Sequence, residues 1–277
     1  MVQQQANQHP ITKYTAEAKH FQQGATGQVF VAYDKETNRN VAIKVIPLAT
    51  ESLKQTFVNE TKLLNKMNCS QFTTRMKECF VFQNRGYIVL ELFDMDLYTR
   101  SEEFGGIEEI KDIFLQVCLA VQELHQHNIA HLDLKPENIL VDMEDNIKLC
   151  DFGSSFEWKN NTYNNKLIGS DFFLAPEVLS YQKGYDAPRA DIWSLGIVLY
   201  MMITGSYPYA GNTREECLQN YFEHNLNFDE LRTALPDDED CYDLLTRILC
   251  KDTTARATID DIFVHPWLCS DETEWSL

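Results

Sequence analysis

The stretch HLDLKPENIL, residues 131–140, gathers polar side chains within a few residues, directly after an apolar helical pattern. Asp133 can accept a proton from a hydroxyl group, and Lys135 can neutralise a nearby phosphate. Asn138 offers an amide oxygen, a hard ligand of the kind that Mg²⁺ prefers. Leu132, however, stands where a charged neighbour is expected. This loop is therefore either a working catalytic loop or the remains of one.

The residues around this loop predict a change from strands to helices along the chain. Short β-rich runs (QVFVAY, NVAIKVI, CFVF and YIVLEL) precede residue 94, with an amphipathic helix over residues 51–67 between the second and third. An apolar stripe then predicts a long helix over residues 107–127, followed by the short runs NILV and IKLC and a mainly helical remainder. We expect a flexible N-terminal tail, a β-rich lobe, a helical lobe and an acidic tail, over residues 1–13, 14–93, 94–270 and 271–277.

The composition, with 44% hydrophobic residues among 277, is that of a soluble globular protein. A formal charge of −18 argues against nucleic-acid and anionic-membrane partners, which require a basic surface, and would attract basic peptides. Eight cysteines without a C-x-x-C pair are typical of free thiols in a reducing compartment. The opening MVQQQANQHP lacks a signal-peptide core, and the longest apolar run is too short to cross a bilayer. We expect a cytoplasmic or nuclear protein.

Two further motifs lie in the β-rich region. In QQGATGQVF, residues 22–30, Gly24 and Gly27 lie in a turn where backbone amides can approach phosphates, although two glycines in a hairpin are usually only a turn. Lys44 lies on an expected central strand, where its charge needs a partner, and Glu60 on the following helix is suitable. Taken alone, a lysine extending from a strand edge into water is the better interpretation of Lys44.

The order of these motifs along the chain decides between the interpretations. DFG, residues 151–153, adds a carboxylate on a glycine hinge, and APE follows at residues 175–177. The series of glycine loop, strand lysine, helix glutamate, Asp-x-Lys-x-x-x-x-Asn, DFG and APE resembles the signature of eukaryotic-type protein kinases. The match extends from Tyr14 to Leu268 and includes DIWSLG and RATIDDIFVHPWL. The resemblance implies the bilobal α+β protein kinase fold, with a small β-rich lobe that carries one regulatory helix and a larger α-helical lobe.

The resemblance also implies ATP and Mg²⁺ as cofactors and a role for each matching residue. Lys44 would hold the ATP phosphates and pair with Glu60, and Asp133 would be the catalytic base, assisted by Lys135. Asn138 and Asp151 would hold Mg²⁺. Gln22, Gly24 and Gly27 would form the phosphate loop, and Val29, Ala42 and Leu140 would enclose the adenine ring. Leu90 would be the gatekeeper residue, Glu91 and Phe93 would belong to the hinge, and Asp96 would reach the ribose.

The same resemblance implies a substrate class. Lys135 is typical of serine/threonine kinases, and Ser170 in GSDFFLAPE stands where these enzymes place a hydroxyl against Asp133 and Lys135. Protein substrates are therefore the expected partners. We also expect the chain to be monomeric. Glu137 and Asp96 match acidic positions that select arginine upstream of the phosphorylated residue. HPWL and GIVLYMMITGSYPY look most like the calcium/calmodulin-dependent kinase group. Glu177 and Arg256 match a buried ion pair that braces the helical lobe, which is a structural prediction.

Several positions depart from the family pattern. Gln22 replaces a glycine of the phosphate loop, and the hinge ELFDMDLY, which precedes and includes Asp96, is about one residue shorter than in many relatives. Leu132 replaces the arginine that receives an activation-segment phosphate, and Phe156 replaces a second basic residue. We therefore hypothesise that the segment 151–177 orders without phosphorylation, through apolar contacts of Phe156, Trp158 and Phe172.

Two alternatives remain open. A pseudokinase, which binds nucleotide or a partner without phosphotransfer, is supported only by Gln22 and Leu132, while Lys44, Asp133 and Asp151 are intact. A small-molecule kinase of similar fold is disfavoured by the intact APE and GSDFF stretches, which shape the peptide platform in protein kinases.

Overall fold

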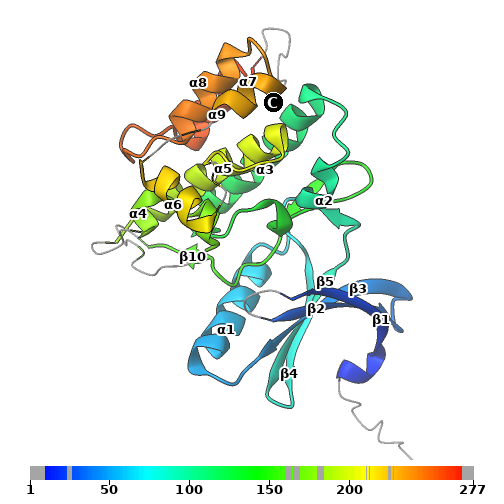
Figure 1. Ribbon diagram of the computed structural model, residues 1–277. Coiled ribbons are helices and arrows are strands. Elements are labelled where there is room, and N and C mark those ends of the chain that lie inside the picture. Colours follow the sequence, from blue (N-terminus) through cyan, green and yellow to red (C-terminus); the bar gives the residue numbers. More distant parts are fainter. Residues whose placement is uncertain are drawn as a thin grey trace, which may run out of the picture. The chain divides into compact units, whose positions relative to one another are not determined.

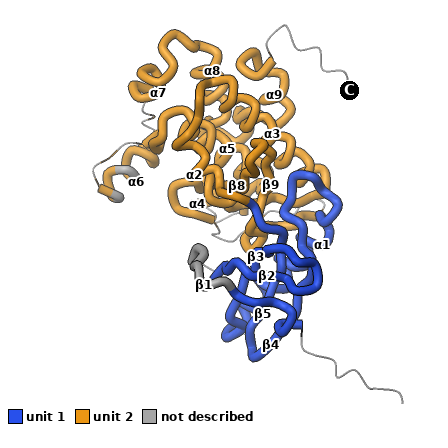
Figure 2. The backbone as a smooth tube through the Cα atoms, turned by 90° about the vertical axis from the view of Figure 1, so that its right-hand side faces the viewer, with its two compact units in different colours: residues 1–93 blue, residues 94–277 orange. Residues whose placement is uncertain are grey.

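The computed structural model describes residues 10–23, 27–159, 164, 169–179, 184–209, 211, 213–223, 226 and 228–269. Backbone contacts divide the chain into unit 1, residues 1–93, and unit 2, residues 94–277, which are blue and orange in Figure 2. Unit 1 is built on an antiparallel sheet, and unit 2 consists mainly of helices (Figure 1). The expected α+β fold, a β-rich lobe followed by a helical lobe, is confirmed.

The described residues of unit 1 contain one α-helix, one 3₁₀ turn and a five-stranded sheet with the strand order β1-β2-β3-β5-β4. The four β-rich runs and the amphipathic helix expected from the sequence correspond to β2 to β5 and α1. In chain order the elements are η1 (Pro10–Lys13), β1 (Tyr14–Gln23), β2 (Gln28–Asp34), β3 (Arg39–Pro47), α1 (Glu51–Lys66), β4 (Met76–Phe82) and β5 (Arg85–Glu91).

The two faces of this sheet have different cores, because successive side chains of a strand point to opposite faces. One face carries a cluster of buried residues, Ala32, Val41, Ile43 and Val89. The other face is covered by α1, whose Phe57 ring lies directly on Gly86 of β5. A Cβ at residue 86 would come within 2.4 Å of that ring, so this position requires glycine.

Only the last residues of the expected N-terminal tail, residues 1–13, are described. Pro10–Lys13 form a 3₁₀ turn, and residues 1–9 lie outside the described part. The Lys13 ammonium is 2.5 Å from Glu78, and the Lys13 carbonyl accepts the Lys35 N–H at 3.1 Å. β1 gave no apolar run to detect, because its sequence, YTAEAKHFQQ, is mostly polar and the strand lies at the sheet edge.

Unit 2 places two long helices, α3 and α5, side by side at its centre (Figure 1). Thirteen of the eighteen α5 residues are buried, so this helix is apolar on every side. Within the described residues, no helix is both long enough and apolar enough to span a bilayer. The helices are α2 (Leu97–Ser101), α3 (Ile107–Gln126), α4 (Pro176–Leu179), α5 (Ala187–Thr204), α6 (Arg214–Glu223), α7 (Phe228–Ala234), α8 (Glu239–Ile248) and α9 (Ile259–Phe263).

The short strands and 3₁₀ turns of unit 2 lie around the helices. β6, β8 and β9 form a three-stranded sheet in the order β6-β8-β9, and β10 pairs with β7. These elements are β6 (Met95–Asp96), β7 (Ile129–Ala130), η2 (Pro136–Asn138), β8 (Ile139–Val141), β9 (Ile147–Leu149), β10 (Phe156–Glu157) and η3 (Asp171–Phe173). The long helix expected over residues 107–127 and the runs NILV and IKLC are confirmed as α3, β8 and β9.

The predicted ion pair in the helical lobe is confirmed. The Arg256 guanidinium donates to both oxygens of Glu177, at 2.6 and 2.9 Å, and its remaining N–H groups donate to the carbonyls of Cys250 and Arg189. The Arg256 side chain is fully buried. It also lies over the Trp193 ring, 5.1 Å from the centroid. This pair ties α4 and α5 to the segment that follows α8.

Candidate active site

Unit 1 contains a buried lysine–glutamate pair. The Lys44 ammonium on β3 lies 2.6 and 2.8 Å from the two carboxylate oxygens of Glu60 on α1. Lys44 is 5% exposed and Glu60 is 1% exposed, so neither charge is solvated by water. A lysine extending into water, the interpretation favoured for Lys44 in isolation, is therefore not what the structure contains. The pair fixes the distance between α1 and the sheet.

The residues assigned to nucleotide binding in unit 1 share the sheet face that carries Lys44. In the register of the sheet, Val29 is opposite Lys44, and Ala42 is opposite Leu90. Cross-strand partners point to the same side, and Ala42 and Lys44 are two residues apart on one strand. The sheet therefore aligns Val29, Ala42, Lys44 and Leu90 on one face.

The predicted phosphate loop is only partly described. Gln22 lies in β1, Gly24 lies outside the described residues, and Gly27 precedes β2. A Cβ on Gly27 would lie 2.3 Å from the Val45 carbonyl oxygen, so the close approach of the two backbones requires glycine there.

The two predicted hinge residues lie at the end of β5 and just beyond it: Glu91 is the last residue of the strand, and Phe93 follows two residues later. The Glu91 carboxylate accepts the Arg75 N–H at 2.7 Å, and the Glu91 N–H donates to the Arg75 carbonyl at 3.1 Å. These two bonds fix the backbone where the strand ends. Phe93 is half-buried and is the last residue of unit 1.

In unit 2, three predicted site residues surround the Asp133 carboxylate: Lys135 and Asn138 from the same stretch after β7, and Ser170 from the residue before η3. The Ser170 hydroxyl donates to Asp133 Oδ1 at 2.8 Å and accepts from the Lys135 ammonium at 2.8 Å. The Asn138 amide donates to Asp133 Oδ2 at 3.1 Å and to the Asp133 carbonyl at 2.7 Å. Lys135 lies 3.7 Å from Asp133 Oδ2. Asp133 is therefore fixed as a hydrogen-bond acceptor, with a cation beside it.

The two predicted metal ligands begin and end the β8–β9 hairpin. Asn138 directly precedes β8, Asp151 follows β9 by two residues, and the Cys150 N–H donates to the Asn138 carbonyl at 3.0 Å. Since the Asn138 NH₂ group donates to Asp133, its amide oxygen is left to act as a ligand. Among the described residues, no cluster of three or more His, Cys, Asp or Glu residues suits a metal ion. An amide and a carboxylate fit Mg²⁺, which usually takes one or two protein ligands plus phosphates and water.

Asp191 on α5 supports this loop, and the sequence analysis did not assign it a role. The Asp191 carboxylate is fully buried and accepts the backbone N–H groups of His131 and Leu132, each at 2.8 Å. It also lies 2.9 Å from His125 Nε2. Leu132 has φ +62°, a strained conformation for a side chain of its size, and the bonds to Asp191 hold it there. The available signal was one carboxylate inside the otherwise apolar α5.

His131 is a second supporting residue that the sequence analysis did not assign. Its Nε2 lies 2.9 Å from the Cys150 carbonyl, which can only accept, so Nε2 carries the proton. Its Nδ1 then accepts the Asp133 N–H at 3.3 Å. The buried imidazole therefore links the backbone of the catalytic loop to the strand end that leads to Asp151.

Two predicted nucleotide contacts lie opposite each other in the small sheet of unit 2. Asp96 on β6 pairs with Leu140 on β8. The buried Asp96 side chain also begins α2, because Oδ1 accepts the Thr99 N–H at 2.8 Å. Asp96 therefore combines the predicted ribose contact with a helix cap.

Glu137, predicted to bind the peptide substrate, lies beside an aromatic cluster. Tyr207 is 5.0 Å from Phe172 and 5.5 Å from Phe173, measured between ring centroids. Burial, followed by the negative charge of Glu137, raises the pKa of Tyr207 to about 12. Within the described part of the chain, buried Glu137 Oε2 has no hydrogen-bond partner.

The first part of the segment 151–177 is bound to the helical lobe. Phe156 on β10 is opposite Ala130 on β7, and the Trp158 N–H donates to the Asn128 carbonyl at 3.0 Å. The Trp158 ring meets the His125 ring edge-on at 5.9 Å. The hydroxyl of buried Ser155 donates to the His131 carbonyl. Thr162, which carries a hydroxyl group in the middle of this segment, lies outside the described residues.

Comparison with known proteins identifies this arrangement. A family model described as the protein kinase domain matches residues 16–268. The chain belongs to this family. The segment that carries Lys44, Asp133, Asp151 and Glu177 is thus a protein kinase domain, and the resemblance that ordered the motifs is confirmed at the level of the family.

The curated relatives agree on the class of kinase. They include the serine/threonine-protein kinase SIK2 of Gallus gallus, 34% identical over 88% of this chain and 30% of the relative. The testis-specific serine/threonine-protein kinase 2 of Mus musculus is 32% identical over 88% of this chain and 70% of the relative. A titin homolog of Caenorhabditis elegans is 29% identical over 88% of this chain, which spans only 1% of that protein. The chain is a serine/threonine-type kinase domain and covers less than a third of the length of SIK2 and the titin homolog.

Proposed function

We propose that this chain transfers the γ-phosphate of ATP to serine and threonine hydroxyls of proteins in a Mg²⁺-dependent reaction. The observation that carries the proposal is the constellation around Asp133. One Asp133 oxygen accepts from Ser170 and the other from Asn138, while Lys135 lies beside both Asp133 and Ser170. A pre-positioned carboxylate beside a cation suits a reaction in which positioning and charge neutralisation do most of the catalysis.

In this proposal each residue has a distinct task. Asp133 orients the substrate hydroxyl and accepts its proton, and Lys135 neutralises charge on the transferred phosphoryl group. Lys44, held by Glu60, binds the ATP phosphates. Asn138 and Asp151 would hold Mg²⁺, which neutralises phosphate charge when bound. Ser170 and Asn138 keep the Asp133 carboxylate in one orientation.

The test is transfer of labelled phosphate from Mg-ATP to a basic serine/threonine peptide, with the Asp133→Asn variant as the matched control. We expect transfer by the wild type and at least a hundredfold less by the variant, roughly the contribution of a general base. If the wild type binds Mg-ATP but transfers no phosphate, the chain is a nucleotide-binding scaffold and the proposal is wrong.

We further propose that activity does not require phosphorylation of the activation segment. Leu132 is an apolar side chain, 6% exposed, at the position that the family resemblance gives to a phosphate-binding arginine. The pairing of Phe156 with β7 and the contacts of Trp158 provide order without a phosphate. An uncharged, buried Leu132 offers no hydrogen-bond donor to a phosphate.

This second proposal is tested on phosphatase-treated protein. We expect the treated wild type to keep its kcat, and Ser154→Ala and Thr162→Ala to keep it as well. A fall of tenfold or more after phosphatase treatment, reversed by prior incubation with an activating kinase, would contradict it.

We propose basic serine/threonine sites as the substrate class, within a kinase most similar to the calcium/calmodulin-dependent group. The family resemblance assigns Glu137 and Asp96 to acidic positions that select arginine upstream of the phosphorylated residue. A guanidinium pairs with a carboxylate through two parallel hydrogen bonds, so a peptide arginine is a suitable partner for Glu137. In matched peptides, Glu137→Gln should raise the KM of the arginine-containing peptide and leave that of its alanine counterpart unchanged. A peptide array that favours acidic or proline-directed sites would exclude this class.

A further inference from the structure

The helix α2 is too short to hold its own position. It contains five residues, Leu97–Ser101, and begins at the Asp96 cap. Isolated helices of this length do not form in water, because nucleation costs more than the few hydrogen bonds return. The placement of α2, and with it the placement of the Asp96 side chain, therefore depends on contacts with the rest of unit 2.

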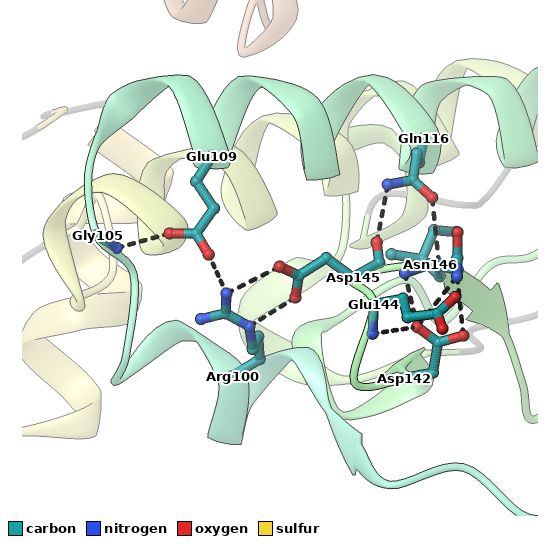
Figure 3. A network of polar contacts seen from close by, with 9 residues as sticks. Arg100, Gly105, Glu109, Gln116, Asp142, Glu144, Asp145 and Asn146 are labelled. Atoms are coloured by element: carbon teal, nitrogen blue, oxygen red, sulfur yellow. Dashed lines mark hydrogen bonds and ion pairs between the residues drawn. The ribbon is translucent and has the colours of Figure 1, made fainter.

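Arg100 makes the most extensive polar contacts from this helix (Figure 3). Its Nε and Nη2 atoms donate to the two oxygens of Asp145, at 2.7 and 3.0 Å, and Nη2 also donates to Glu109. Figure 3 shows the guanidinium lying between these two carboxylates. The Arg100 side chain is only 13% exposed and lies over the Phe104 ring. Planar, two-pronged pairing of this kind fixes direction as well as distance.

Both partners of Arg100 are held by their own elements. Glu109 belongs to α3 and also accepts the Gly105 N–H at 2.6 Å. Asp145 lies in the β8–β9 turn, and its carbonyl accepts the Gln116 amide of α3 at 2.9 Å. Asp142 closes the same turn by accepting the backbone N–H groups of residues 144 and 146 (Figure 3). Arg100 is thus anchored to two rigid elements.

The anchored elements are those that carry the candidate nucleotide site of unit 2. The β8–β9 hairpin begins after Asn138 and leads to Asp151, and its turn is the one that Arg100 holds. Asp96 pairs with Leu140 of the same hairpin. The Arg100 contacts therefore fix α2 to the turn of the β8–β9 hairpin, and this turn is the end of the hairpin opposite to Asn138 and Asp151.

We propose that Arg100 is a positioning residue for the nucleotide, which keeps Asp96 where it can hydrogen-bond the ribose. This inference rests on the proposed kinase function and extends it to a residue that touches no substrate. Without Arg100, α2 loses its fixed direction, and the Asp96 carboxylate no longer occupies one place. The loss falls on binding of ATP, whereas the Asp133 constellation, which has no contact with Arg100, keeps its geometry.

The experiment compares ATP with 2′-deoxy-ATP, because the pair differs only in a ribose hydroxyl. In steady-state phosphotransfer, Arg100→Ala should raise the KM for ATP about fivefold, the effect of losing one hydrogen bond of ordinary strength. The ratio of the KM for 2′-deoxy-ATP to the KM for ATP should fall toward one. The kcat of the variant should stay within about twofold of the wild-type kcat. Added to Asp96→Asn, Arg100→Ala should cause no further change in this ratio.

The matched control is Arg247→Ala, which also removes an arginine–aspartate ion pair, with Asp243, but on α8. It should leave both KM values unchanged. A merely structural role of Arg100 would lower the melting temperature and leave the ratio of the KM values at its wild-type value, and this result would overturn the proposal. A ratio of one in the wild type, with equal KM values for ATP and 2′-deoxy-ATP, would also overturn the proposal.

A milder pair of variants covers the case in which Arg100→Ala does not fold. Arg100→Lys keeps the charge but loses the two-pronged geometry, and Asp145→Asn keeps Arg100 but weakens its pairing. Both should move the ratio in the same direction by a smaller factor. If the wild type transfers no phosphate, the proposed function fails. Calorimetric binding of Mg-ATP and Mg-2′-deoxy-ATP then tests Arg100 independently.

Discussion

The Ser170 hydroxyl links the two charged side chains of the catalytic loop, Asp133 and Lys135. It donates to Asp133 and accepts from Lys135. Ser170→Ala should lower kcat about tenfold, the loss expected from one charge-assisted hydrogen bond, with little change in the KM for ATP. Ser170→Thr keeps the hydroxyl and should retain most of the activity. Steady-state kinetics measure both, and an alanine variant with wild-type kcat would show that Ser170 does not orient Asp133.

A second prediction for a single residue concerns the effect of a charged side chain at position 132 on stability. Its side chain is buried, and its backbone is held at φ +62° by Asp191. Leu132→Arg would place a guanidinium in this buried position without an anion to pair with it. Removing the partner from a buried ion pair costs about 3–5 kcal/mol, and an unpaired arginine here should lower stability by a similar amount. Chemical denaturation of dephosphorylated protein measures this, and an unchanged midpoint would indicate that the arginine reaches water.

The residues of the loop were predictable from sequence because their order along the chain is distinctive. Asp133, Lys135 and Asn138 lie within six residues, and Ser170 was expected against the first two, where the structure places it. Their catalytic roles stay predictions. The role of Asp191 was not predicted, because the sequence of an apolar helix does not indicate what a single aspartate side chain contacts. Only the fold shows that it accepts the backbone N–H groups of residues 131 and 132.

The longer elements were predicted well because their apolar spacing is strong. α1 and α3 each contain an apolar stripe, and β3 and β5 consist mainly of apolar residues, with Lys44 as the exception inside β3. The two-residue strands β6, β7 and β10 could not be recognised, since elements this short have no periodicity. They exist because long-range pairing supplies their hydrogen bonds. The same is true of α2, whose direction depends on Arg100.

The buried ion pair between Glu177 and Arg256 connects several elements, so we expect a large loss of stability when one partner is removed. Glu177→Ala would leave the buried guanidinium of Arg256 with the carbonyls of Cys250 and Arg189 and the Trp193 ring, but without the carboxylate that balances its charge. Removing one member of a buried pair typically costs about 3–5 kcal/mol in the free energy of unfolding. Denaturant titration measures this. Asp229→Ala, which removes an exposed ion pair with Arg232, is the control and should leave the midpoint unchanged.

The Asp142 carboxylate in the β8–β9 turn should make the stability of the protein depend on pH in the acidic range. Burial alone would raise the pKa of Asp142, but hydrogen bonds from the Asn146 side chain and the backbone lower it, and the net pKa lies below its ordinary value. A carboxyl whose pKa is lowered on folding stabilises the fold above its unfolded-state pKa, about 4, and this contribution disappears as the pH falls through the folded-state pKa.

Asp142→Asn should therefore be less stable than the wild type at neutral pH, and the difference should shrink as the pH is lowered below about 4. Denaturation midpoints of the two proteins, measured across this range, give the comparison. A difference that is independent of pH would mean that the charge of Asp142 does not contribute.

At the scale of the whole molecule, the charge is divided unequally between the two units. Residues 1–93 contain 11 Lys and Arg against 7 Asp and Glu, whereas residues 94–277 contain 13 against 35. The net charge is thus +4 in unit 1 and −22 in unit 2, which carries Glu137 and the Asp133 loop. A negative field of this size attracts basic substrates over distances longer than any single contact.

Long-range attraction is screened by salt, because the Debye length falls from about 10 Å at 0.1 M to about 3 Å at 1 M ionic strength. The KM for an arginine-rich peptide should therefore rise several-fold between about 50 and 300 mM NaCl, while kcat stays nearly constant. A peptide of the same length without charge should have a KM that is insensitive to salt. Glu137→Gln removes one close contact but leaves the field of unit 2, so it should raise the KM at every salt concentration and keep most of the slope. Equal salt dependence for charged and neutral peptides would mean that the acidic balance serves solubility alone.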